Sequence, residues 1–259
     1  MDDKGVSPVV AVLLLLNVFI GIYAIYMSVT VPGEFASKEK EHMLDVRESF
    51  FKLQRAVQEM SASEARSISV PMSADLTSGI FRGPSIGGRV TAREGTLRFE
   101  LKNAYYLPQI YAYENGAVIL VQLTDNRSMM VSRPTMVSVV PYGSGDNVKV
   151  CLQSIQLIGS GEITSTGIET FTVLVENSWQ TPIPEEPNME NVTIVINSNY
   201  QDAWRDYLVE LVEQLHENGI HATVDVQNLQ LTIHGKITTT GVNDIYLVRE
   251  FKDISITIS

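Results

Sequence analysis

The stretch Val6–Val31, VSPVVAVLLLLNVFIGIYAIYMSVTV, contains no charged residue. Its roughly 26 residues would extend about 39 Å as an α-helix, enough to cross the hydrocarbon core of a bilayer with some tilt. Tyr23 and Tyr26 lie toward its end, where amphipathic rings favour a membrane interface. Pro32-Gly33 then predicts a break in the helix. The sequence therefore predicts a transmembrane helix at residues 6–31.

Length, charge and cysteine content narrow the function classes. The chain has 259 residues, a formal net charge of -11 and one cysteine, Cys151. An acidic surface repels phosphate backbones, so nucleic acid is not expected as a partner. A single cysteine excludes an internal disulfide and a cysteine-based zinc site. Membrane attachment must come from the apolar segment, and the lipid bilayer is the first expected partner.

The residues before the helix resemble a known leader. The N-terminal segment is similar to the leader of archaeal type IV pilin-like precursors. It reads Lys4-Gly5-Val6-Ser7-Pro8-Val9-Val10 and runs directly into the apolar helix. The resemblance implies a leader peptide at residues 1–5, which a prepilin-type peptidase removes between Gly5 and Val6 after the basic Lys4. One departure is Val10, which stands where bacterial pilins carry a membrane-buried Glu.

The leader also decides the expected orientation, because the charges that flank the span are nearly balanced. Processing on the cytoplasmic side would leave the helix on the mature chain and the body outside. The resemblance therefore implies a single-pass protein of the plasma membrane with its C-terminal body extracellular.

A second helix is expected at residues 37–61. Apolar residues recur there at alternating spacings of three and four, with charged and polar residues on the opposite face. These seam residues are Met43, Val46, Phe50, Leu53, Val57 and Met60. An amphipathic stalk helix usually covers the core of its own domain. The alternative is a helix–helix seam between subunits, which would continue the membrane helix into a bundle or filament core.

The middle of the chain, residues 66–177, carries the signals of a mainly-β domain. Short alternating runs such as Thr96–Lys102 are separated by Gly-rich turns, and Asn115-Gly116 between two apolar runs is a strong hairpin signal. Several short strands of this kind predict a sandwich or a roll.

The C-terminal part has a different pattern. Residues 178–190 contain three prolines and acidic residues, which predicts a linker. Residues 191–259 then predict a small α/β unit of the β-α-β-β kind, with a helix that ends at Gly219 and an alternating last strand.

Three further segments resemble a family of uncharacterised archaeal surface proteins. They are Glu39–Met60, Tyr113–Ala117 and Asn197–Trp204, the last of which ends in an Ala-Trp pair. In that family a pilin-like leader precedes a β-rich ectodomain and a small C-terminal unit. The resemblance implies this architecture and a cell-surface location, without an activity.

No motif for catalysis, metal or cofactor binding stands out. Gly83–Gly87 matches the G-x-S-x-G pattern, but the following residues return to a strand, which favours a loop over a nucleophile elbow. His216 and His221 flank a helix stop and do not form an i, i+4 pair. We therefore predict a protein that is not an enzyme and has no catalytic residue, metal site or cofactor.

Two sequons, at Asn126 and Asn191, are candidates for N-glycosylation.

Two functions follow from this pattern. The first is a pilin-like structural or assembly protein of an archaeal cell surface, which assembles with itself or with other pilin-like subunits. The alternative is a singly tethered binding or adhesion module that does not form filaments.

Overall fold

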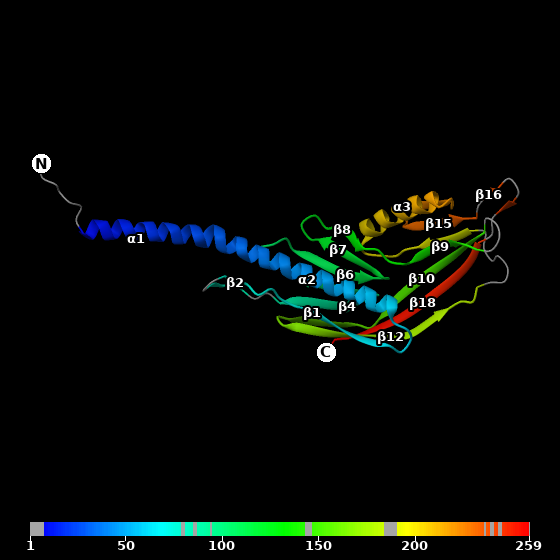
Figure 1. The fold of residues 1–259 in the computed structure, drawn as a ribbon, viewed down its shortest axis with the longest axis horizontal. Helices are drawn as coiled ribbons and strands as arrows, with labels where there is room; N and C mark the ends of the chain where they lie inside the picture. The colour runs from blue at the N-terminus through cyan, green and yellow to red at the C-terminus, as the bar shows by residue number, and fades with distance from the viewer. Residues whose placement is uncertain are drawn as a thin grey trace.

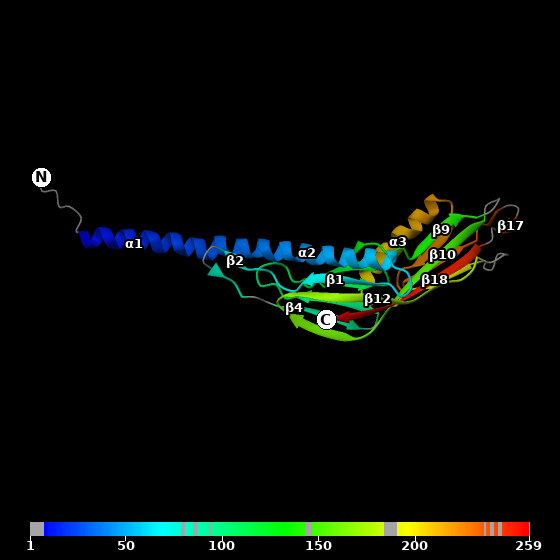
Figure 2. The same cartoon turned by 60° about the horizontal axis from the view of Figure 1, so that its bottom comes forward.

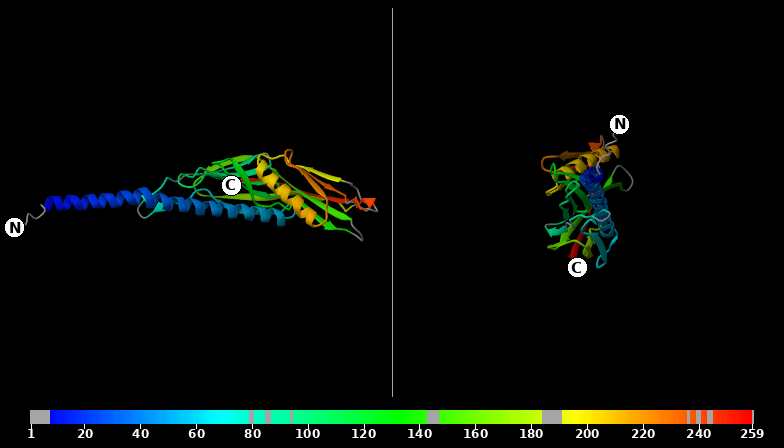
Figure 3. Two further views of the ribbon diagram at one scale, coloured as in Figure 1. Left: turned by 90° about the horizontal axis from the view of Figure 1, so that it is seen from above. Right: turned by 90° about the vertical axis from the view of Figure 1, so that its left-hand side faces the viewer.

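The structure, a computed structural model, describes residues 8–78, 81–84, 87–93, 95–142, 147–183, 191–235, 237–238, 241–242 and 245–258. One long helix projects from a β-rich body, and its second half lies along that body (Figures 1 and 3). The predicted long apolar N-terminal helix and mainly-β domain are confirmed.

The long helix is continuous from Pro8 to Glu59. It consists of α1 (Pro8–Ile25), a π-helical turn (Tyr26–Thr30) and α2 (Val31–Glu59). The predicted break at Pro32-Gly33 is therefore wrong. In an α-helix the proline ring meets the carbonyl four residues earlier. Here that carbonyl belongs to Ser28, inside the wider π turn, and a π turn accommodates such a local irregularity without ending the helix.

The body contains three main sheets. The large sheet has the order β1 (Ala65–Pro71), β12 (Ile168–Gln180), β18 (Ile245–Ile258), β10 (Val148–Ile158), β9 (Val137–Pro141). Its β10–β18 pair is parallel and the other pairs are antiparallel.

The central sheet is antiparallel throughout. It has the order β11 (Gly161–Ser165), β4 (Gly88–Arg93), β5 (Thr96–Leu101), β6 (Gln109–Glu114), β7 (Ala117–Gln122), β8 (Arg127–Ser132). The hairpin predicted at Asn115-Gly116 is confirmed. Both residues have positive φ, 44° and 82°, as a tight two-residue turn between twisted strands requires.

The small sheet has the order β13 (Asn191–Val195), β15 (Gln230–His234), β14 (Ala222–Asp225), and helix α3 (Gln201–Glu217) connects β13 to β14. Gly219, at φ 74°, ends α3 as predicted: its N–H bonds to His216, and the next N–H bonds to Leu215. Two short ribbons complete the described strands, β2 (Thr77–Ser78) with β3 (Phe81–Arg82) and β16 (Ile237–Thr238) with β17 (Gly241–Val242).

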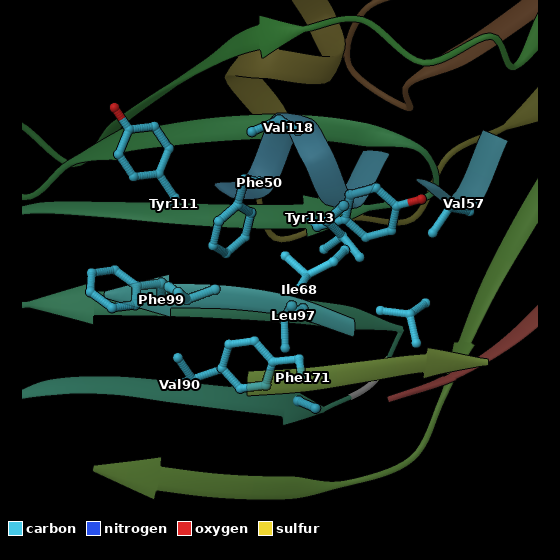
Figure 4. Packing of buried hydrophobic residues seen from close by; sticks show 14 of the residues in the cluster. Phe50, Val57, Ile68, Val90, Leu97, Phe99, Tyr111, Tyr113, Val118 and Phe171 are labelled. Carbon is cyan, nitrogen blue, oxygen red and sulfur yellow. The ribbon is translucent and has the colours of Figure 1, made fainter. Parts of the chain in front are cut away.

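Strands β6 and β7 of the central sheet are buried on both faces, so the sheet contributes to two cores. Tyr111, Tyr113 and Val118 face the first core, which also contains α2 and part of the large sheet (Figure 4). The alternate side chains Ile110 and Ile119 face the second core, which contains α3 and the small sheet. Strands buried on both faces are apolar in sequence without strict alternation, as Ala117–Val121 is.

The C-terminal unit predicted at residues 191–259 is not one separate body. Its last strand, β18, lies in the large sheet between β12 and β10 instead of joining the small sheet. Isoleucines at one end of β18 face the first core and apolar residues at the other end face the second. A strand with two buried faces has a better place in the middle of a sheet than at the edge of a small unit. Of the linker predicted at 178–190, residues 178–180 belong to β12, and 184–190 lie outside the described residues.

Candidate functional site

The exposed half of the long helix is the first functional feature. No side chain of α1 is buried, although it is almost wholly apolar. By length and composition this helix can cross a membrane. An apolar surface of this size is stable in lipid or against other apolar helices, and not in water.

The six seam residues occupy a different environment. All of them are buried in the first core against the β-strands of the same chain, as Figure 4 shows for Phe50 and Val57. The alternative prediction, that the six seam residues contact another subunit, is therefore wrong. An amphipathic helix that already covers its own core has no apolar stripe left for a second copy. The only apolar helical surface left open within the described residues belongs to α1.

A buried carboxylate fixes α2 to the loop between β5 and β6. Glu39 is 2% exposed, and its oxygens accept the backbone N–H groups of Ala104, Tyr105 and Tyr106 at 2.9, 2.8 and 2.6 Å. Three charge-assisted hydrogen bonds offset the cost of removing the carboxylate from water. This contact orients α2 against the loop between β5 and β6.

A buried amide and a buried ammonium group hold the rest of α2. Gln54 donates to the carbonyls of Gly116 and Arg133 at 2.7 and 2.9 Å, which ties the helix to the central hairpin. Lys252, on β18, donates to the carbonyls of Val57, Gln58 and Met60. A cation there satisfies the unpaired carbonyls at the helix C-terminus and opposes the negative end of its dipole.

A second set of contacts lies where α2 leaves the body. Val31, Phe35 and Leu76 form a small buried cluster. Lys38 donates to the carbonyl of Thr77, and the hydroxyl of Ser78 donates to Glu34. The arm that carries β2 lies beside the helix here (Figure 2). The helix is thus braced by the body on the side toward α1.

One cavity with a mixed apolar and polar lining, which we call the cleft, has a volume of about 410 Å³ and lies between the small and large sheets. Strand β13 and the residues after it, 191–197, form one wall. Leu152, Gln153 and Ser154 of β10 and Leu247, Arg249 and Phe251 of β18 form the other. This volume and this mixture of side chains are typical of ligand-binding clefts.

Glu114 and Trp204 lie at the end of the cleft near the central hairpin. Burial raises the pKa of the Glu114 carboxyl, while a 2.9 Å hydrogen bond from Ser198 and the nearby indole N–H of Trp204 partly oppose that rise. The indole is fully buried and its N–H reaches no acceptor at hydrogen-bond geometry within the described residues. The cleft therefore offers a polar end beside an apolar wall.

The two predicted glycosylation sites differ in accessibility. Asn126 is exposed in the turn before β8, but the hydroxyl of its sequon residue Ser128 is buried and accepts the N–H of Ala203 at 3.2 Å. Asn191 begins β13, lines the cleft and bonds to His234 at 2.9 Å. Both remain predictions as modification sites.

Three histidines come closer together than the sequence indicated. The ring centroids of His216 and His221 are 5.9 Å apart, and those of His221 and His234 are 5.1 Å apart. Nevertheless, no group of three or more His, Cys, Asp or Glu residues within the described chain has the geometry of a metal site.

Two sequence features fall wholly or partly outside the described residues. The predicted cleavage residues Lys4, Gly5 and Val6 lie outside them, as does the serine of the G-x-S-x-G pattern.

A family model for a family of unknown function, DUF7289, matches residues 4–242. The chain belongs to this family. The matched range includes the long helix, the central sheet and β13, so α1 and one wall of the cleft fall within the family's shared region. No curated protein and no solved structure matches the chain significantly.

Proposed function

We propose that this chain is a membrane-anchored, pilin-like structural or assembly protein of an archaeal cell surface, with its body outside the cell. The observation that carries the proposal is the division of one continuous helix. Its first half is apolar and fully exposed, while its second half is buried on the body of the same chain. The leader resemblance supplies the cellular context, with removal of residues 1–5 by a prepilin-type peptidase.

In this proposal the contacts of α2 join the body rigidly to the membrane helix. Because polar side chains and a hydrophobic core hold α2 along its length, the body cannot swivel freely about its anchor. A displacement of the body would therefore also displace α1. Self-assembly, or assembly with other pilin-like subunits, would use α1, since the seam residues of α2 are already covered.

Two measurements test this proposal. Mass analysis of the N-terminus of the native protein should give a chain that starts at Val6, and Gly5→Leu should block that processing. Cysteine at Val18 of α1, in a Cys151→Ser background, should form disulfide-linked dimers in native membranes. Cysteine at Ile168 of the body, which is at least as exposed as Val18, is the control and should not. An intact Met1 together with no cross-link at either position would reject a pilin-like assembly.

The second candidate function is a singly tethered binding module. The observation that favours it is the cleft between the small and large sheets. Strands β10, β15 and β18 extend toward the end of the body remote from α1 (Figure 1). In this proposal β13, α3, β14 and β15 act as a small α/β unit that supplies one wall. A chain that stays uncross-linked through α1 and still binds a ligand in the cleft would support this candidate over the first. Neither candidate function needs an enzymatic step or a cofactor.

A further inference from the structure

The edge strands of the three main sheets are protected to different degrees. Natural proteins usually place a charge or a proline on an exposed edge strand, because its free backbone groups would otherwise pair with another chain. Five edges follow this rule with Arg66 and Pro71 on β1, Pro141 on β9, Glu162 on β11, Arg127 on β8 and Asp225 on β14. The sixth edge, β13, reads NVTIV and has neither.

The backbone groups of β13 that have no partner among the described residues face the cleft. In its antiparallel pair with β15, residues alternate between those that bond to β15 and those that bond outward. The N–H of Ile196 bonds to the carbonyl of Leu229 on the β15 side at 3.0 Å, so the register assigns Val192 and Ile194 to that side too. Thr193 and Val195 therefore direct their N–H and C=O groups away from β15. All residues from 191 to 197 line the cleft.

The shape of the cleft matches an extended chain. It runs along seven residues of one wall, about 20 Å at the usual strand rise. The opposite wall presents apolar side chains, Leu152, Leu247 and Phe251, together with the cation Arg249. A segment lying between the walls could bond to β13 through its backbone, bury alternate apolar side chains and place a carboxylate near Arg249.

We propose that the cleft binds an extended peptide segment of a partner protein, which adds a fourth strand to the small sheet through Thr193 and Val195. The segment has alternating apolar residues and one acidic residue. This inference rests on the second candidate function, the tethered binding module, and names the class of its partner.

The test uses the full chain in detergent micelles and the peptide Thr-Val-Thr-Asp-Thr-Val-amide with fluorescein on its N-terminal amine, in which the valines and the aspartate lie on one side of the extended chain. Thr193→Pro removes the outward N–H, while the bonds from β13 to β15 use other residues. We expect Thr193→Pro to weaken peptide binding about tenfold or more, measured by fluorescence anisotropy. Thr193→Val is the matched control, because it keeps the N–H and the side-chain shape, and it should bind as the parent does.

A second measurement needs no variant. In hydrogen–deuterium exchange the amides of Thr193 and Val195 should exchange fast in the free protein and become protected when the peptide is added. The same peptide with its alternate backbone nitrogens methylated should not protect them. Equal binding by Thr193→Pro and the parent, or unchanged exchange at both amides, would overturn the inference. Protection that rises with protein concentration alone would also overturn it, because a second copy would then occupy the edge.

These outcomes are separable from those of the anchor experiment. Absence of cross-links through α1 tests whether the chain is a single tether, and it does not depend on what the cleft binds. Failure of the peptide in an uncross-linked chain would remove the peptide as partner and leave the single tether in place.

Discussion

The two halves of the long helix are built for different surroundings. Residues 8–25 are almost entirely apolar and bury nothing in the chain, whereas residues 31–59 alternate apolar and charged faces and bury twelve side chains. The first half needs an apolar medium outside the protein, and the second half needs the body. Because the helix is continuous, a movement of α1 in its apolar surroundings also moves α2 and the β-rich body.

The largest effect expected from this comparison comes from placing one charge in each half. Phe50→Asp puts a carboxylate without a partner in the first core, where Phe50 is 2% exposed. It should cost more than about 4 kcal/mol and unfold the body. Phe19→Asp in α1 should leave the unfolding of the body unchanged and reduce membrane retention instead. Thermal unfolding in micelles, followed by circular dichroism, measures the first effect, and membrane fractionation measures the second.

A stable body in Phe50→Asp, with a change in oligomeric state alone, would contradict this division. That result would mean that the seam residues contact another copy and not their own core.

The next effect tests the buried carboxylate. Glu39→Ala leaves the backbone N–H groups of Ala104, Tyr105 and Tyr106 without their acceptor, so we expect a loss of about 2–4 kcal/mol in the free energy of unfolding. Glu41→Ala, on the exposed face of α2, is the control and should change it by less than about 0.5 kcal/mol. Denaturant unfolding compares the two, and equal midpoints would show that Glu39 does not hold the helix to the body.

A smaller effect is expected at the end of α2. Lys252→Met keeps most of the side-chain volume but removes the donor to three helix carbonyls. The expected loss is about 1–2 kcal/mol. Amide exchange should show the last turn of α2 opening more often, while exchange near Glu39 stays the same. Lys52→Met, an exposed position on the same helix, should alter neither.

The smallest effect concerns pH. Burial lowers the pKa of His42 below its usual value of 6.5, against the opposing influence of its bond to the Pro71 carbonyl and of Asp45 and Glu39. The unfolded chain then binds a proton at this site more readily than the folded chain, so stability should fall as the pH drops below about 6.5. In the His42→Gln variant the midpoint of denaturant unfolding should change less between pH 7 and pH 5 than it does in the parent. A change as large as that of the parent would show that another group is responsible.

Parts of this architecture could be predicted because their causes are local. An uncharged run of apolar residues is sufficient to indicate the helix from Pro8, and Asn115-Gly116 is sufficient to indicate a hairpin, since both residues tolerate positive φ. The end of α3 at Gly219 follows in the same way. The sequence also indicated the buried face of α2, but it left open whether this face met the body or another subunit.

The remaining features depend on contacts between residues far apart in the sequence. Pro32 signals a break by itself, and only the π turn before it lets the helix continue. Nothing local distinguishes Glu39 from the exposed Glu41, or Lys252 from a surface lysine, because their partners lie in distant segments. Likewise, the alternating last strand was compatible with a small separate unit.

The sequence by itself thus determined the long apolar helix, the turns and the strand-forming runs, through hydrophobicity and backbone preference. The tertiary structure decided that β18 completes the large sheet, that one central sheet serves two cores, and that β13 is left as an unprotected edge beside a cleft. Strand order and polar pairing follow from which surfaces can be buried together, and that is a property of the whole chain.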